Sequence, residues 1–369
     1  MGHATRMASV AEGLAEEGFQ VAFSSSGEVT QWLRAKGYPC NDIPLVDVAY
    51  DDTGTFSSRA TARDAPTILS RFDKQIASEL RNLMTYSPDV VISDSMFSTV
   101  IAARILGLRA VAILNQLKLF ASPRTPHLVS LLISSGSVIL GDILWGSCES
   151  VIVPDLPPPY TISERNLWNA GSSSARAKYV GFLTPRNNGR PDALTERLRK
   201  ATKALVFWQV SGPPATRGPF LAKAMALASQ LDEKYVFVIA AGNPQGGTEP
   251  RPIPGGYMYE WCPSPGPLLD MCSAVISRAG HVSVSDYVQR GKPAVLVPIP
   301  SQTEQVGNAE KADRLGIAIK LEDDELDAGT VDESLRSLAE GKFLARAREM
   351  REVARGYDAR GSIVKLVRG

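Results

Sequence analysis

A basic residue, a glycine, two serines and an acid stand close together in the segment RAGHVSVSD, which runs from Arg278 to Asp286. The apolar run AVIS precedes this segment, so we expect it where a strand turns into a helix. Glycine lets the backbone come close to a ligand, and the amides at a helix start favour negative charge. A phosphate group fits such a turn, with the guanidinium of Arg278 and the hydroxyl of Ser283 as further donors.

Asp286 is negatively charged and therefore cannot bind a phosphate group. Its spacing from Ser283 has two interpretations. The S-x-x-D spacing is typical of a capping box, which ties down the start of a helix. Alternatively, the carboxylate of Asp286 binds the paired hydroxyls of a ribose. The spacing alone leaves both interpretations open.

Strand-like and helix-like segments alternate along the chain, which favours parallel sheets covered by helices. In the first half, the pattern predicts strands at 20–26, 89–94 and 109–116, and helices at 8–19, 28–37 and 97–107. The same alternation starts again at residue 204 and continues to residue 316. We therefore expect an α/β protein with two Rossmann-like domains that face each other across a cleft.

The segment GFLTPRNNGRPD, residues 181–192, is rich in Gly, Pro, Asn and Arg, which suits an interdomain linker. It places the first domain at 1–183 and the second at 184–356. In doubly wound sheets, ligands bind beyond the carboxyl ends of the strands. The side chains expected at one crevice of the first domain are therefore Ser24 to Ser26, Asp94, and Asn115 to Gln116.

The second half resembles the donor-binding half of UDP-glycosyltransferases with the GT-B fold. Trp261 to Pro263 resembles their W-x-P motif, and RAGHVSVSD resembles their H-C-G-W-N-S-x-x-E segment. It is more similar still to the R-S-G-x-x-T-V-S-E segment of the bacterial transferases that add N-acetylglucosamine to the undecaprenyl-diphospho-muramoylpentapeptide cell-wall precursor. The later elements GKP, VPIP and EQVGNA follow in the same order. At the other end, MGHATR resembles the Gly-x-Gly-His loop of this superfamily and the G-H-A-T-R opening of its archaeal members.

The resemblance implies a role for each matching residue. Trp261 is expected beside the uracil, and Asp286 at the ribose. The diphosphate site is expected to consist of Arg278, Ala279, Gly280 and Ser283. The donor sugar hydroxyls are expected to contact Glu304 and Gln305, with Asn308 as a further candidate. Other interpretations are an ordinary core aromatic for Trp261 and a solvated helix start for Glu304.

The general base is expected in the first domain, where the resemblance places the acceptor. His3 is the candidate base and Asp94 its partner, because an imidazole can accept a proton near neutral pH and a strand-end carboxylate can orient it. The reverse assignment, with Asp94 as the base, stays open. The resemblance also implies that residues 357–369 form a helix that crosses back to the first domain. We further expect the two domains to close around the linker, because water must be excluded from the reaction.

The predicted function is transfer of a hexosyl or N-acetylhexosaminyl group from a UDP-sugar to an acceptor hydroxyl. Inversion follows from the resemblance, and UDP-GlcNAc is the leading donor. The acceptor is expected to be a lipid-linked sugar or a polyol. No cofactor is expected, and no metal, because no D-x-D pair lies at a crevice strand end. The alternatives are a non-catalytic subunit that binds a nucleotide sugar or a lipid carrier, and a nucleotide-sugar epimerase.

The composition excludes several other classes of protein. The 40 basic and 39 acidic residues give a net charge of +1 without a clustered basic tract, which argues against nucleic acid as a partner. The four cysteines form no CxxC pair and have no histidine at metal-ligand spacing, which favours reduced thiols in the cytoplasm.

The most apolar window, HLVSLLISSGSVILGDILWG from His127, is interrupted by serines, glycines and Asp142, so we do not expect it to cross a bilayer. One interpretation is a buried helix of the first domain. The other is a surface for peripheral contact with the cytosolic face of a membrane or with a lipid-carried acceptor.

A further expectation concerns the region before MGHATR. A parallel sheet needs an apolar strand there, which the natural product would carry upstream of Met1.

Overall fold

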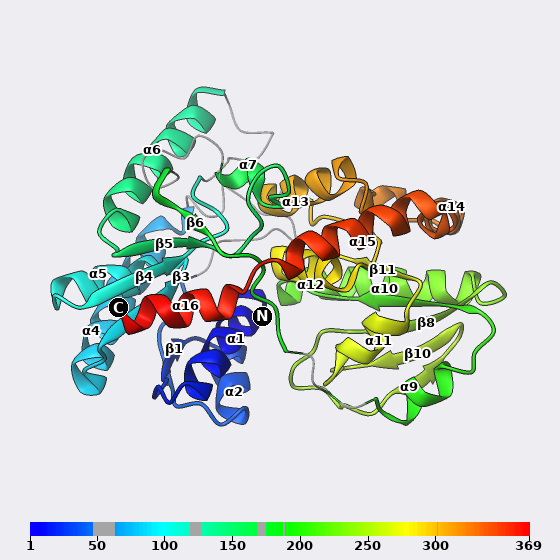
Figure 1. Ribbon diagram of the computed structural model, residues 1–369, viewed down its shortest axis with the longest axis horizontal. Helices are drawn as coiled ribbons and strands as arrows, with labels where there is room; N and C mark the ends of the chain where they lie inside the picture. Colours follow the sequence, from blue (N-terminus) through cyan, green and yellow to red (C-terminus); the bar gives the residue numbers. More distant parts are fainter. Residues whose placement is uncertain (47–62, 119–126, 168–174, 187–188, 190, 301) are drawn as a thin grey trace. The chain divides into compact units, whose positions relative to one another are not determined.

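The computed structural model describes residues 1–46, 63–118, 127–167, 175–186, 189, 191–300 and 302–369 (Figure 1). The chain forms two compact units. The described residues up to Leu183 form unit 1 together with Tyr357–Gly369, and Thr184–Gly356 form unit 2. Each unit has parallel β-structure and its own core.

The described residues of unit 1 form two separate parallel sheets. The smaller pairs β1 (Phe23–Ser25) with β2 (Cys40–Asp42). The larger has the order β3-β4-β5-β6. Its strands are β3 (Val90–Asp94), β4 (Arg109–Ile113), β5 (Ser150–Val153) and β6 (Lys178–Tyr179).

Helices cover both faces of the larger sheet of unit 1. Alternate residues of β4 point to opposite faces and so contact different helices. Val111 and Ile113 pack with α1 (Gly2–Glu16) and α16 (Ala359–Arg368). Ala112 packs on the other side, with α5 (Phe97–Ile105) and α6 (His127–Trp145). The other helices among the described residues of this unit are α2 (Glu28–Ala35), α4 (Ala65–Tyr86) and α7 (Glu164–Leu167).

The helix α6 is only partly buried, so the interpretation as a buried helix is wrong for its described side chains. Trp145 lies in the core, but Ile139, Leu140 and Ile143 are exposed. Among the described residues, no helix has the length and apolar character needed to cross a membrane.

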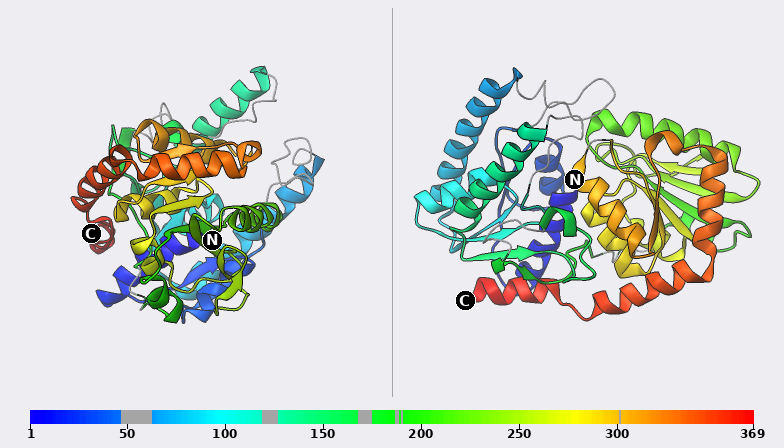
Figure 2. Two further views of the ribbon diagram at one scale, coloured as in Figure 1. Left: turned by 90° about the vertical axis from the view of Figure 1, so that its right-hand side faces the viewer. Right: turned by 90° about the horizontal axis from the view of Figure 1, so that it is seen from above.

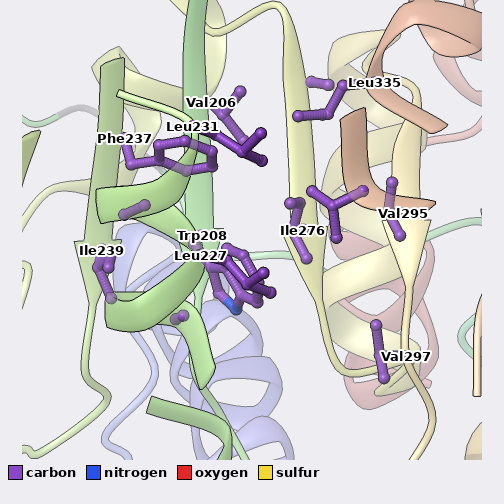
Figure 3. Packing of buried hydrophobic residues seen from close by; sticks show 14 of the residues in the cluster. Val206, Trp208, Leu227, Leu231, Phe237, Ile239, Ile276, Val295, Val297 and Leu335 are labelled. Carbon is purple, nitrogen blue, oxygen red and sulfur yellow. The ribbon is translucent and has the colours of Figure 1, made fainter. Parts of the chain in front are cut away.

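Unit 2 is built on a seven-stranded sheet with the order β13-β12-β11-β7-β8-β10-β9, in which only β9 runs antiparallel to its neighbour. The bounds are β7 (Ala204–Gln209), β8 (Tyr235–Ala240), β9 (Arg251–Ile253), β10 (Gly256–Tyr259), β11 (Ala274–Ser277), β12 (Ala294–Leu296) and β13 (Ala318–Lys320). All four residues of β11 are buried, as expected for a parallel strand covered on both faces. Trp208 and Phe237 lie in one core cluster (Figure 3). Phe220 packs against Trp208 in the same cluster.

Helices lie on both faces of this sheet (Figure 2). The first four are α9 (Ala193–Leu198), α10 (Pro214–Gln230), α11 (Pro265–Met271) and α12 (His281–Arg290). The chain continues through α13 (Thr303–Arg314), the 3-10 turn η1 (Asp323–Glu325), α14 (Ala328–Ala339) and α15 (Gly341–Arg355). The crevice edge of the sheet is formed by the loops that follow the carboxyl ends of β11 and β12, before α12 and α13.

Candidate active site

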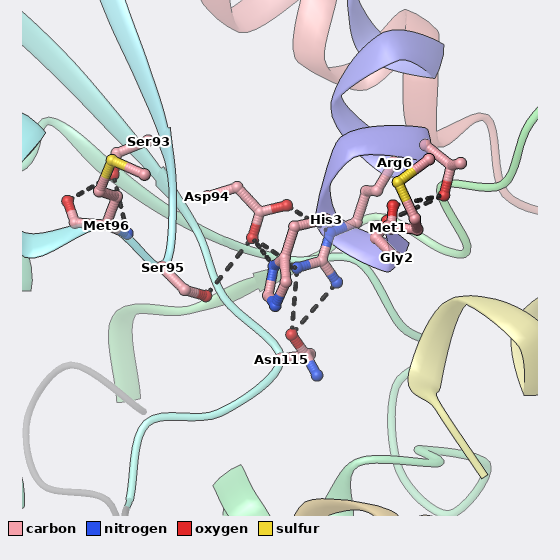
Figure 4. Close-up of polar contacts among 10 residues, drawn as sticks. Met1, Gly2, His3, Arg6, Ser93, Asp94, Ser95, Met96 and Asn115 are labelled. Atoms are coloured by element: carbon pink, nitrogen blue, oxygen red, sulfur yellow. Dashed lines mark hydrogen bonds and ion pairs between the residues drawn. The ribbon is translucent and has the colours of Figure 1, made fainter. Parts of the chain in front are cut away.

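A histidine, an arginine, an aspartate and an asparagine meet in unit 1 (Figure 4). His3 Nδ1 lies 2.9 Å from Asp94 Oδ1. Arg6 donates from Nε to Asp94 Oδ2 at 2.8 Å and from Nη1 to Asn115 Oδ1 at 3.2 Å. A second bond to each of these partners comes from Nη2 of the same guanidinium. The four side chains therefore form one hydrogen-bonded cluster.

Two features of the sequence bring this cluster together. His3 and Arg6 are three residues apart in the first turn of α1, so they project from the same face of the helix. Asp94 is the last residue of β3, and Asn115 follows the end of the adjacent parallel strand β4. Since parallel neighbours end at the same edge, both polar side chains reach the start of α1.

The carboxylate of Asp94 is held ionised by its neighbours. The side chains of Arg6 and Asp94 are only 1% and 5% exposed. Burial by itself raises the pKa of Asp94, but Arg6 and then His3 lower it by more, so the pKa lies well below its usual range. Asp94 is therefore a weak proton acceptor at neutral pH. In the tautomer of His3 with the proton on Nδ1, the ring donates to Asp94 and Nε2 is the acceptor. Arg6 Nη2 also lies 3.1 Å from the same Nδ1. The His3 side chain is 62% exposed.

Arg6 was missed by the sequence analysis, although it lies in MGHATR. The signal that could have revealed it is its spacing of three residues from His3 on a predicted helix. Asn115 was expected at the crevice but had no assigned role. Ser24 was expected at the same crevice, yet β1 belongs to a separate sheet, and the Ser24 hydroxyl accepts a bond from Asn82 of α4.

In unit 2, Arg278 is buried in the fold rather than directed at open space. Its Nη1 donates to Asp323 Oδ1 at 2.8 Å and to the Val297 carbonyl at 3.2 Å. Its guanidinium carbon lies 4.0 Å from the centre of the Phe220 ring. Burial lowers the pKa of Arg278 by more than Asp323 raises it. The guanidinium therefore links the end of β11 to the end of β12 and to η1, and its role at a diphosphate stays a prediction.

The turn after β11 leaves the first amides of α12 without a side-chain cap. The N-cap is Gly280, which has no side chain that could cap the helix. The capping-box interpretation of Ser283 and Asp286 is therefore wrong, because Ser283 lies inside the helix. Apart from its chain neighbours, none of the described residues would lie within 4 Å of a Cβ atom on Gly280. Ala279 is fully buried and Ser283 is partly exposed.

Asp286 lies on the second turn of α12, where its Oδ1 accepts a bond from Arg290 Nε at 2.9 Å. Burial raises the pKa of Asp286 above its usual value, although Arg290 lowers it. The carboxylate also lines a polar cavity of about 520 Å³ that includes Thr184 and Gln289. Its role at a ribose stays a prediction.

The predicted sugar-binding residues lie on the first turns of α13. Asn308 is fully buried and donates from Nδ2 to the Ala279 carbonyl at 3.0 Å. The Oε1 atom of Gln305 accepts a bond from the Ile299 amide at 3.1 Å. Glu304 is partly exposed. Asn308 thus connects α13 to the turn after β11, and Gln305 stabilises the loop after β12.

Trp261 lies apart from this group in the described contacts. Its backbone amide donates to the Gly247 carbonyl at 3.0 Å. The residue is partly exposed, which argues against an ordinary core aromatic. A role beside the uracil stays a prediction.

Known proteins resemble this chain in both sequence and fold. Residues 256–359 match the glycosyltransferase family 28 C-terminal domain. An uncharacterized glycosyltransferase from Methanosarcina acetivorans is 23% identical over 321 residues, which is 86% of this chain and 81% of the relative. A 78-residue stretch is 37% identical to the UDP-N-acetylglucosamine--N-acetylmuramyl-(pentapeptide) pyrophosphoryl-undecaprenol N-acetylglucosamine transferase of Legionella pneumophila, covering 20% of this chain and 22% of that enzyme.

The fold is similar to that of solved glycosyltransferases. A spinosyn rhamnosyltransferase complexed with thymidine diphosphate superposes with a TM-score of 0.70 at 17% identity, covering 100% of this chain and 97% of that chain. The resemblance inferred from the sequence motifs is thereby confirmed, as is the GT-B fold. The chain is a glycosyltransferase of the GT-B fold that carries a family 28 C-terminal domain at residues 256–359.

Proposed function

We propose that the protein transfers a hexosyl or N-acetylhexosaminyl group from a UDP-sugar to an acceptor hydroxyl, with inversion at the anomeric carbon and without a metal ion. The observation that carries this proposal is the contact of 2.9 Å between His3 Nδ1 and Asp94 Oδ1. It leaves Nε2 of an exposed imidazole as a proton acceptor, with an ionised carboxylate behind it.

The reaction is a single displacement. His3 Nε2 takes the proton of the acceptor hydroxyl while the hydroxyl oxygen attacks the anomeric carbon. The bond from that carbon to the diphosphate oxygen breaks, and UDP leaves with the electron pair. Asp94 stabilises the imidazolium that forms, and Arg6 holds Asp94 in place and ionised. The imidazolium then releases its proton to solvent.

Charge on the leaving diphosphate is stabilised in this proposal by the uncapped amides at the start of α12, with the hydroxyl of Ser283. Arg278 contributes by fixing the turn between β11 and α12, because its charge is already neutralised by Asp323. Asn308 fixes the same turn through the Ala279 carbonyl. No step in this scheme requires a divalent cation.

The donor and the acceptor are assigned by chemistry and similarity. Asp286 binds the ribose, Trp261 stacks beside the uracil, and Glu304 and Gln305 contact the sugar hydroxyls. The name of the Legionella relative includes UDP-N-acetylglucosamine and a pyrophosphoryl-undecaprenol acceptor. The rhamnosyltransferase neighbour holds thymidine diphosphate, another pyrimidine nucleoside diphosphate. These similarities favour UDP-GlcNAc as the donor and a lipid-linked sugar or a polyol as the acceptor.

The test is a transfer assay with radiolabelled UDP-GlcNAc, UDP-glucose and TDP-glucose, each with a total membrane lipid extract or with glycerol. We expect UDP release that depends on the acceptor, label in the product, and inverted anomeric configuration by proton NMR. The His3→Ala variant serves as the inactive control. An epimerised sugar nucleotide, or donor binding without transfer to any acceptor, would contradict the proposal.

A further inference from the structure

A cavity of about 590 Å³ lies in unit 2 at the amino ends of its strands. Its wall includes Ala204, Tyr235 and Ala274, which are the first residues of β7, β8 and β11. The predicted donor residues follow the carboxyl ends of β11 and β12, at the opposite edge of the same sheet. We call this cavity the amino-edge pocket. Its volume is within the range of about 300 to 1,000 Å³ that is typical of sites for small organic ligands.

The amino-edge pocket combines an apolar wall with a basic rim. Apolar side chains from the sheet and from the covering helices α14 and α15 contribute Val206, Leu335 and Leu344. The charged residues of its lining are all basic: Arg290, Lys292, Arg336, Arg348 and Arg351. Such a wall favours a ligand that has an apolar group and a negative charge.

Two of these cations lack a partner among the residues that the structure describes. Arg290 pairs with Asp286, and Arg336 pairs with Asp332. Across the described ranges, by contrast, neither Arg348 nor Arg351 forms an ion pair. The Nε atom of Arg351 is also buried without an acceptor in this part of the chain. A buried N–H without an acceptor is unfavourable, and an oxygen of a bound anion would satisfy it.

Arg351 is held in position by the turn that ends α12. Gly291 caps this helix with φ of 64°, in the left-handed region. A Cβ atom on Gly291 would lie 3.2 Å from Cδ of Arg351, so the arginine side chain packs directly over the glycine. Such packing reduces the rotamer freedom that Arg351 loses when it binds a ligand.

We propose that the amino-edge pocket is a second binding site for a small organic phosphate. Arg348 and Arg351 bind the phosphate oxygens, because a guanidinium offers paired donors that match phosphate geometry. The apolar group of the ligand lies on Val206 and Leu335. This site differs from the predicted diphosphate site, because it lies at the other ends of the strands. It adjoins the cavity beside Asp286, since Arg290, Lys292 and Arg351 line both.

Phenyl phosphate is the probe, with inorganic phosphate and phenol as its two halves. Isothermal titration of the full-length protein should show saturable binding of phenyl phosphate, at least about tenfold tighter than either half. Equal affinity for inorganic phosphate would show that the apolar wall plays no part and would overturn the proposal. The absence of saturable phenyl phosphate binding would do the same.

The paired variant Arg348→Gln with Arg351→Gln should weaken phenyl phosphate binding at least tenfold, since each lost contact is a charge-assisted hydrogen bond. Arg355→Gln is the matched control, because Arg355 lies on the same helix but pairs with Glu352 and does not line the pocket. Unchanged binding in the paired variant, or equal weakening in the control, would contradict the site.

A second variant tests the pocket independently, in case the paired variant does not fold. Ala339 is exposed at the end of α14 and lines the pocket, so Ala339→Glu adds a negative charge with little effect on packing. It should also weaken phenyl phosphate binding at least tenfold while the affinity for UDP is kept.

Flotation with phosphatidic acid vesicles tests a lipid source of the phosphate. Flotation that is lost in the paired variant would overturn the assignment to a soluble ligand.

Discussion

Arg278 and Asp323, 45 residues apart in sequence, form an ion pair with 2.8 Å between Nη1 and Oδ1, and their side chains are 4% and 28% exposed. Lys223 joins the same carboxylate at 2.6 Å. Asp323 therefore neutralises two cations, one of them inside the core of unit 2. Because Arg278 directly follows β11, this ion pair stabilises the conformation of the turn before α12.

The Asp323→Asn variant should lower the free energy of unfolding by about 2 kcal/mol at pH 7, because it leaves the buried Arg278 without its counter-charge. Burial raises the pKa of Asp323, but Lys223 and Arg278 lower it by more. The stabilisation is therefore present above the unfolded pKa of about 3.9 and is lost as the pH falls below it. Urea unfolding at pH 7 and pH 3 should show a smaller difference from wild type at pH 3. Asp324→Asn, at the exposed neighbour, is the control, and a comparable loss there would contradict this account.

His3→Ala should lower kcat by about 100-fold or more, because the acceptor hydroxyl loses its proton acceptor. The affinity for UDP should not change, since the predicted donor residues belong to unit 2. Single-turnover kinetics and titration with UDP separate these two effects. Thr5→Ala, in the same turn of α1, should keep full turnover. An equal loss in that variant would indicate a disturbed helix instead of a lost base.

Asp94→Asn keeps the shape of the side chain but removes its charge. Arg6 is then a buried cation with no carboxylate, so the free energy of unfolding should fall by about 3 kcal/mol. Turnover should fall as well, because His3 loses the carboxylate that stabilises its imidazolium. Thermal unfolding and steady-state kinetics measure the two effects. If His3→Ala retains full turnover while Asp94→Asn is inactive, the roles are exchanged and Asp94 is the base.

Local patterns located the functional segments, but they did not reveal the partners of their side chains. The strand-turn-helix at Arg278 follows from an apolar run, a glycine and helical spacing, all within a dozen residues. Arg278 contacts Asp323 because η1 returns to the sheet next to the end of β11. The spacing of nearby residues in the sequence does not predict this contact. The same holds for Asn308, whose partner is a carbonyl 29 residues away.

The sequence also suggested one crevice for all first-half strands, because each strand ends in polar residues. Pairing between strands decides which ends meet, and it is a long-range property. Asp94 and Asn115 meet because β3 and β4 are neighbours. Ser24 does not join them, because β1 pairs with β2. Arg6 could have been found locally, from its helical spacing to His3.

The Arg290→Gln variant should make donor binding more sensitive to acid. Burial raises the pKa of Asp286, and Arg290 lowers it, so removal of Arg290 should raise this pKa further. If the Asp286 carboxylate accepts bonds from ribose hydroxyls, UDP affinity falls as the pH drops through that pKa. The midpoint of this loss should therefore shift to higher pH in the variant, as measured by titration with UDP from pH 5 to 8. Identical pH profiles would indicate that Asp286 does not contact the donor.

Turnover should continue in excess EDTA. Charge develops on the diphosphate as the bond to the anomeric carbon breaks, and the uncapped amides at the start of α12 are fixed dipoles that favour negative charge at that place. Fixed amides need no reorganisation during the reaction, so a cation adds little to this stabilisation. The assay compares initial rates with EDTA, with added manganese after EDTA, and without either. Equal rates are expected, whereas loss of activity with EDTA and its return with manganese would mean that a metal ion, not the amides of α12, carries the charge of the leaving group.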